Sequence, residues 1–470
     1  MKLRTCLYYL ATIVIGLLCC RDLLYGAIQE PALTNAGHSW DYNIWRTVAL
    51  ARSLRSLSLG GWVADFGFGY GYPLFTFTAP GAYLFPALLY NLGVDVNRAL
   101  ACTWILIFVS VAPLCFFSTR KIFGNKSALL VSILYLLAPY HFTDVFVRTN
   151  LSETQVFLYL PLLFYGLTTD EIKRSYAIIW AGLAIAAVAL THLPSIILVL
   201  VPFTIFSLAS GGRVFYRFAV AIVGGLIFAS PFLLPALLYL DEVRGAAGLL
   251  EDYYSYQHHF VYWFQLISSY WERGASSDGP FDTMSFSLSA WIVVAGLLSL
   301  LQAAKADAKA AQKLSESQVV IFAGVLTTVS TTFLMTAESG LIWQHIAPLA
   351  MVQFPWRFLM PTSFFLGLSC ANFPDFFVKR FGRFGDLSML CLCGFLFYSQ
   401  WDYGVVVKYD RIDRGELTRE QIIKRGIYTT NSHEFLPKAV KRVPSGGEVR
   451  QGVAEFYYRG RGRMEGRVVW

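Results

Sequence analysis

Apolar segments recur along almost the whole chain, and they restrict its fold more than any other feature. A helix crosses a bilayer with about 20 apolar residues, and about 17 suffice. The candidate crossings are 5–25, 98–118, 127–140, 154–169, 176–192, 194–210, 218–240, 284–302, 319–337, 358–374 and 385–400. Only 14% of the 470 residues are charged, whereas a soluble domain carries about 25%. The sequence therefore predicts an all-α polytopic membrane protein with about eleven transmembrane helices.

The loops between these segments alternate in charge and length. Short basic loops lie at 119–126, 170–175, 211–217, 302–313 and 377–383, and longer aromatic loops with acidic residues lie at 26–97, 141–153, 241–283 and 338–357. Because basic loops stay on the cytoplasmic side of a membrane, we expect the acidic loops outside. The apolar run 80–93 is short and contains two prolines. Counting it as a crossing would invert every later loop, so we predict a half-inserted or interfacial helix there.

The same pattern predicts two parts of the chain. Residues 1–400 form a transmembrane domain whose first outer loop is 26–97. Residues 401–470 form an extracytoplasmic C-terminal segment, and strand-like pieces at 404–410 and 455–460 favour an α+β or β-rich structure for it. The net charge of +8 is expected to serve topology and contact with anionic lipids. Nucleic-acid binding is not expected, because the sequence has no basic soluble domain with a known motif.

One acidic residue, Asp41, lies beyond the end of the first apolar segment, in the outer stretch 37–86, which is rich in Trp, Tyr, Phe, Gly and Pro. One interpretation is a helix start, in which Ser39 caps the helix and Asp41 complements the helix dipole. The other is a general base at the membrane surface that deprotonates an acceptor hydroxyl or amine. Both can hold together, because a first-turn carboxylate can also project into a pocket.

The second outer loop contains His141, Asp144, Arg148 and Glu153. The simplest interpretation is a local ion pair of small worth between Asp144 and Arg148, which lie four positions apart. In the alternative, Arg148 binds a phosphate, and Asp144 or Glu153 positions a substrate or a divalent metal. The location of this loop on the same side as Asp41 favours the alternative.

Two further candidates lie at the outer ends of later segments. His192 ends the segment 176–192, where a single histidine is more often structural than functional. Arg357 follows Trp356, where it is placed for a lipid phosphate or, together with Trp356, for an interfacial belt. The sequence contains no ATP phosphate loop, no zinc-protease motif and no nucleophile elbow.

Taken in order, these motifs resemble the bacterial integral membrane family labelled "6-pyruvoyl-tetrahydropterin synthase-related", the YfhO-like proteins, and more broadly the GT-C superfamily of membrane glycosyltransferases. The residues that carry the resemblance are Asp41, 69–73, 79–80, 138–140 followed by Asp144, Arg148 and Glu153, 191–194, 354–358 and 434–437. The resemblance implies a GT-C-like fold and a sugar donor linked to a polyprenyl phosphate.

The resemblance also implies roles for the candidate residues. Asp41 would act as the catalytic base, with Asp144 and Glu153 assisting it. The substrate-binding candidates are Arg148, His192, Arg357, Tyr70, Tyr72 and His141. Arg148 and Arg357 would bind the phosphate. No cofactor is implied, and a divalent metal is left open. Trp40 precedes Asp41, so no second acid pairs with it, which argues against a metal-dependent mechanism.

The implied partners are membrane lipids, the polyprenyl-phosphate sugar, and a glycan, lipid or protein acceptor. The implied location is a bacterial cytoplasmic (inner) membrane, with the active site on the periplasmic, or extracytoplasmic, side. Two other functions stay open. A transporter or flippase of lipid-linked glycans would place charges inside the crossings, and a non-catalytic envelope assembly protein would retain the fold without the chemistry.

Overall fold

Helices form almost all of the computed structural model, which describes residues 3–57, 61–244, 252–268, 270–308, 314–429, 433–440, 443, 453–457 and 465–469. The longer helices are α1 (Leu3–Cys19), α2 (Arg21–Ile28), α3 (Trp40–Arg55), α5 (Gly81–Asn91), α6 (Val96–Leu136), α8 (Leu151–Thr168), α9 (Arg174–Thr191), α10 (Ser195–Ser210), α11 (Gly212–Leu238), α14 (Ala290–Ala308), α15 (Glu316–Leu334), α18 (Leu359–Ser369), α19 (Phe373–Phe381) and α20 (Gly385–Ser399). The short helices are α4 (Leu74–Phe77), α7 (Pro139–Phe142), α13 (Trp263–Ile267), α16 (Gly340–His345), α17 (Ala347–Ala350) and α21 (Arg419–Arg425). The strands are β1 (Thr34–Asn35), β2 (Tyr409–Asp410), β3 (Val453–Tyr457) and β4 (Glu465–Val469).

A helix covers most of each predicted crossing, so the prediction of an all-α bundle is confirmed. The run 80–93 forms α5, the short helix expected there. Within the described ranges, α6, α9, α11 extended to Glu242, and α15 are long and apolar enough to span a membrane, and α1 with α2 forms a fifth, bent candidate. The chain is an integral membrane protein, and the count of eleven crossings stays a prediction.

The outward face of α11 illustrates why the bundle needs a lipid environment. Val223, Ile227, Leu234 and Leu238 recur at helical spacing, so they lie on one face of the helix. Ile227 and Leu238 expose 67% and 75% of their surface. An apolar stripe of this kind would be costly in water and is stable against hydrocarbon.

The helices differ from the sequence prediction at two places. The basic loop expected at 119–126 is mostly helical, because α6 continues through it and is interrupted only at Gly124. The φ of 78° at this residue lies outside the helical region and suits glycine, which has no Cβ. The first predicted crossing is divided into α1 and α2, which meet at an angle of 66°.

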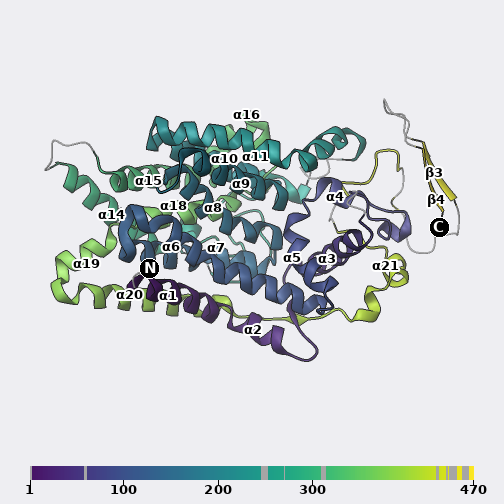
Figure 1. The fold of residues 1–470 in the computed structure, drawn as a ribbon, viewed down its shortest axis with the longest axis horizontal. Coiled ribbons are helices and arrows are strands. Elements are labelled where there is room, and N and C mark those ends of the chain that lie inside the picture. Colours follow the sequence, from purple (N-terminus) through teal and green to yellow (C-terminus); the bar gives the residue numbers. More distant parts are fainter. Residues whose placement is uncertain are drawn as a thin grey trace.

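The central helix of the bundle is α18, around which α6, α8 and α15 are packed (Figure 1). All eleven of its residues are buried. The hydroxyls of Ser363 and Ser369 donate to the carbonyl oxygens of Leu359 (2.7 Å) and Phe365 (2.8 Å), so these polar groups are satisfied inside an apolar interior. Arg357 lies in the 3-10 turn Pro355–Phe358 that leads into this buried helix, so the packing of α18 positions the backbone of that candidate residue.

The C-terminal segment packs along the first outer loop, and α3, α4 and α21 gather at the end of the bundle opposite α19 (Figure 1). β1 of the first loop pairs antiparallel with β2, with Thr34 opposite Asp410. The amide of Gly67 donates to the carbonyl of Ile427 at 2.9 Å. β3 and β4 form a second antiparallel pair. Of the two predicted forms, the mixed α and β form is present.

Candidate functional site

Asp41 lies in the first turn of α3 and is half-buried. Its Oδ1 accepts a hydrogen bond from the amide of Tyr42 at 2.9 Å. Burial raises the pKa of the Asp41 carboxyl, and the nearby amides and the charge of Arg46 offset part of that shift. The predicted cap by Ser39 is wrong, because the Ser39 side chain makes no capping bond and its backbone amide is instead bonded to Thr149 Oγ1 (3.0 Å).

The second outer loop lies directly against the start of α3. The amide of His38 donates to the carbonyl of Val147 at 3.0 Å. The side-chain amide of Asn43 donates to the carbonyl of Thr149 at 2.7 Å. Because Asn43 is buried, these bonds hold the helix of Asp41 in a fixed position beside the loop that contains the other acids.

Four charged side chains from the second and fourth outer loops meet in the interior. We call them the charged cluster, and they are Asp144, Arg148, Glu153 and Arg357. Nη1 of Arg148 lies 2.5 Å from Asp144 Oδ1 and 3.0 Å from Glu153 Oε2. The Tyr140 hydroxyl accepts from Arg148 Nη1 (2.7 Å) and donates to Glu153 Oε1 (2.5 Å). The local ion pair between Asp144 and Arg148 is therefore present, and both carboxylates of the charged cluster are fully buried, so it differs from the exposed pairs that contribute little to stability.

Arg357 completes the charged cluster from the turn before α18. Its Nε lies 3.4 Å from Glu153 Oε2. The guanidinium of Arg148 lies 4.8 Å from the ring centroid of Trp356, and that of Arg357 lies 4.8 Å from the ring of Phe354. Aromatic faces stabilise desolvated cations. The two arginines predicted to bind phosphate are therefore already matched by two buried acids.

The two candidate histidines occupy different surroundings. His192 follows the last residue of α9 and borders the charged cluster, with its Nδ1 2.7 Å from Ser195 Oγ. His141 is fully buried between the rings of Phe108 and Phe157, whose centroids lie 4.2 and 4.3 Å from its own. The structure thus gives His141 a packing role, and it leaves His192 at the edge of the site.

Tyr70 and Tyr72 belong to a tight loop that meets the C-terminal segment. The glycines within 67–71 have φ values of 58°, 84° and 87°, which only glycine adopts at no steric cost. Tyr72 is buried, and its hydroxyl accepts a hydrogen bond from the amide of Phe435 at 3.2 Å. Its ring also packs against Tyr428, with centroids 5.6 Å apart. This loop therefore holds the C-terminal segment in place.

Arg46 is a site residue that the sequence patterns did not indicate. It lies on α3, five positions after Asp41, and its Nη1 donates to the hydroxyl of Tyr83 at 2.9 Å. That hydroxyl lies 3.1 Å from Ser152 Oγ, next to the charged cluster. Nη2 of Arg46 donates to the carbonyl of Thr429 in the C-terminal segment. The available signal was a basic residue on the predicted outer helix that begins with the candidate acid.

In the part of the chain that the structure describes, no group of three or more His, Cys, Asp or Glu side chains is arranged to hold a metal ion. The carboxylates of Asp144 and Glu153 are both engaged by Arg148. In this arrangement, oxygens of both carboxylates interact with the guanidinium of Arg148.

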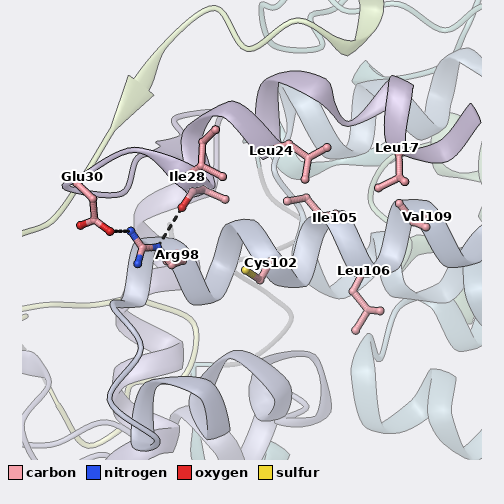
Figure 2. Close-up of a pocket in the computed structure, with 10 residues that line it drawn as sticks. Leu17, Leu24, Ile28, Glu30, Arg98, Cys102, Ile105, Leu106 and Val109 are labelled. Carbon is pink, nitrogen blue, oxygen red and sulfur yellow. Dashed lines mark hydrogen bonds and ion pairs between the residues drawn. The ribbon is translucent and has the colours of Figure 1, made fainter. Parts of the chain in front are cut away.

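Two apolar cavities lie among helices away from the charged cluster. The first, of about 660 Å³, runs along α1, α2 and α6 and is lined by apolar side chains such as Leu17 and Leu106 (Figure 2). At one end Arg98 pairs with Glu30. The second, of about 520 Å³, lies between α13, α14, α15 and α18. Apolar surfaces of this kind suit contact with lipid hydrocarbon.

Comparison with solved structures defines the class of fold. Arabinofuranosyltransferase AftD from mycobacteria has a TM-score of 0.50 and 16% identity, over 85% of this chain and 28% of that chain. ArnT from Cupriavidus metallidurans, solved with undecaprenyl phosphate, has a TM-score of 0.47 and 12% identity, over 90% of this chain and 68% of that chain. The oligosaccharyltransferase of Archaeoglobus fulgidus has a TM-score of 0.49 and 10% identity, over 84% of this chain and 55% of that chain.

At these identities the comparison with AftD shows the fold alone, and this chain spans about a quarter of that enzyme (28%). The chain has the fold of the GT-C membrane glycosyltransferases, as the resemblance implied. No protein-family model matches the chain, and the comparison with curated protein sequences found no match. The narrower label "6-pyruvoyl-tetrahydropterin synthase-related" therefore has no support from sequence comparison.

Proposed function

We propose that the chain is an inverting membrane glycosyltransferase that moves a sugar from a polyprenyl-phosphate donor to an extracytoplasmic glycan, lipid or protein. The observation that carries the proposal is the fixed placement of Asp41 beside the second outer loop, through the bonds that His38, Ser39 and Asn43 make to that loop. The GT-C fold supports it, since the solved structures with this fold include glycosyltransferases. We place the site at the outer face of a bacterial inner membrane.

In the proposed reaction Asp41 takes the proton from the acceptor hydroxyl or amine. The acceptor atom attacks the anomeric carbon of the donor, and a new glycosidic bond forms on the opposite face of the sugar. The bond between the anomeric carbon and the phosphate oxygen breaks, and its electron pair stays on the polyprenyl phosphate. Holding both substrates at one membrane surface supplies much of the orientation that the reaction needs.

The charged cluster acts in this proposal as a support for the site and not as its base. Asp144 and Glu153 are both held by arginine, so their oxygens are committed to ion pairs. Asp41 makes no ion pair within the part of the chain that is described. A base must be able to accept a proton in reach of a substrate, and Asp41 meets that requirement better than either buried acid.

The test replaces Asp41 with Asn and measures transfer from a radiolabelled polyprenyl-phosphate sugar pool by membranes that contain equal amounts of inserted protein. Loss of a general base is expected to lower the rate by a factor of about 10² to 10⁴. The matched control is Glu30→Gln in the same outer loop, where the side chain is 78% exposed. Full transfer by Asp41→Asn would overturn the base role, and loss of transfer in both variants would indicate a general defect.

A further inference from the structure

Three arginines near the proposed site, Arg46, Arg148 and Arg357, differ in how their charge is balanced. Arg148 and Arg357 lie within 3.4 Å of carboxylate oxygens of the charged cluster. Arg46 forms no ion pair with any carboxylate in the described ranges, and its two hydrogen bonds go to neutral acceptors, the Tyr83 hydroxyl and the Thr429 carbonyl. Its Nε is buried and has no hydrogen-bond partner among the described atoms. Among the described residues, Arg46 therefore has a charge without an ion-pair partner and an unused donor.

The position of Arg46 relates this charge to the proposed chemistry. The guanidinium is close enough to Asp41 to influence that carboxyl, yet it forms no ion pair with it. Through the Tyr83 hydroxyl it is linked to Ser152, the neighbour of Glu153. An anion bound at Arg46 would thus lie between the proposed base and the charged cluster.

We propose that Arg46 binds the phosphate group through which the lipid-linked sugar is attached to its carrier. This assignment rests on the proposed function and identifies one residue that would recognise the donor. A guanidinium presents donors in a planar fork that matches phosphate oxygens, and it keeps its charge when it is partly buried. As the bond to the sugar breaks, charge accumulates on the phosphate, and a cation held in place stabilises that charge without reorganisation.

The aromatic contacts of Arg46 fit this role. Its guanidinium lies 5.7 Å from the ring centroids of both Tyr42 and Tyr83. Together with the bond to the Thr429 carbonyl, these contacts limit the rotamers of a long side chain. A pre-positioned cation loses less conformational entropy when a ligand binds, so the geometry favours recognition of a phosphate by Arg46 over that by an exposed lysine or arginine.

The test measures binding of farnesyl phosphate and of farnesol to the full chain in detergent, for wild type, Arg46→Gln, Arg46→Lys and Arg52→Gln. Arg52 is the matched control, because it lies on the same helix and also donates to a carbonyl of the C-terminal segment, that of Leu417. Its charge is already paired with Asp65 at 2.6 Å. Arg52 thus makes the same kind of contact to the C-terminal segment as Arg46, but its charge is paired.

Wild type is expected to bind farnesyl phosphate about 10- to 100-fold more tightly than farnesol, as for a hydrogen bond to a charged group. Arg46→Gln should remove most of this preference, Arg46→Lys should keep part of it, and Arg52→Gln should keep all of it. An equal concentration of inorganic phosphate should not displace farnesyl phosphate, and displacement would overturn the lipid-linked source.

Two results would separate this assignment from the proposed function. A wild-type preference that Arg46→Gln leaves unchanged, or that Arg52→Gln removes equally, would overturn the role of Arg46 and leave the glycosyltransferase proposal standing. A wild type that binds farnesyl phosphate no better than farnesol would overturn both, because neither could then rest on a phosphate-linked donor.

Discussion

Glu153 is the residue on which the balance of buried charge depends. It lies between Arg148 and Arg357, and it also accepts the hydroxyl of Tyr140. Removing its charge would leave two buried guanidinium groups with only Asp144 as an acidic partner. A buried charge without its counter-ion is far more costly than an exposed one.

Glu153→Gln is therefore expected to destabilise the protein by about 3 to 5 kcal/mol. The measurement is the melting temperature of the purified chain in detergent, compared with wild type. Glu30→Gln is the control, because Glu30 is exposed and its pair with Arg98 should contribute little. Equal melting temperatures for Glu153→Gln and wild type would show that the charged cluster does not stabilise the fold.

The acidity of Asp41 predicts how transfer depends on pH. A general base works in its ionised form, so activity should fall as the pH drops through its pKa. Burial raises the pKa of Asp41, so this fall should be centred above the ordinary carboxyl value of about 3.9. A pH profile of transfer at saturating donor checks the prediction, and a profile centred at or below the ordinary value would contradict it. Asp41→Glu retains a carboxyl, so its transfer activity should also fall as the pH is lowered.

At this scale the sequence could predict which charged residues are local neighbours, but not which arginine has no ion-pair partner among the described residues. Asp144 and Arg148 are local neighbours, and their pairing follows from helical spacing. The contact of Glu153 with Arg357 joins residues from two distant loops. Because such a contact depends on the packing of α18, Arg46 could be distinguished from Arg357 only in three dimensions.

Among the elements, the glycine-rich loop at 67–71 has the most specific geometry. A Cβ on Gly71 would lie 2.2 Å from Nε1 of Trp62, and the residue has a positive φ of 87°. Gly71→Ala should therefore destabilise the protein by more than about 1 kcal/mol, through both strain and collision. Melting temperature and limited proteolysis of the C-terminal segment measure the effect.

Gly93 provides the control for this prediction. Its φ is 92°, similar to that of Gly71, but a Cβ there would meet nothing within 4 Å. Gly93→Ala should show the conformational cost alone. Equal losses in the two variants would mean that the contact with Trp62 does not matter.

The elements divide clearly into those that the sequence could predict and those that it could not. Long apolar runs predicted a helix at each crossing, because burial in lipid requires every backbone group to be bonded within its own helix. The same rule says little about polar stretches, and 119–126 continues as a helix up to the break at Gly124. The wide π-helical turn Thr143–Val147, which carries Asp144, likewise has no simple composition signal.

At the scale of the whole molecule, the predicted topology places the first and third outer loops on the same side. In a background without the exposed Cys6 and Cys391, Leu57→Cys and Phe281→Cys should react with a membrane-impermeant maleimide on intact cells. Both side chains are almost fully exposed, at 89% and 88%. Lys121→Cys should react only after lysis. Labelling of Leu57→Cys and Phe281→Cys from opposite sides would contradict the arrangement on which the proposed site depends.

The pairing of β1 with β2 has a consequence for biosynthesis. The ribosome makes the first outer loop early, whereas the strand that pairs with it and the residues that pack on Tyr72 emerge only near the end of translation. Until then the backbone of β1 lacks its pairing strand. A stalled or prematurely released nascent chain would thus display unpaired backbone and aromatic rings to quality-control proteases, and only a polypeptide translated past its last crossing would close that surface.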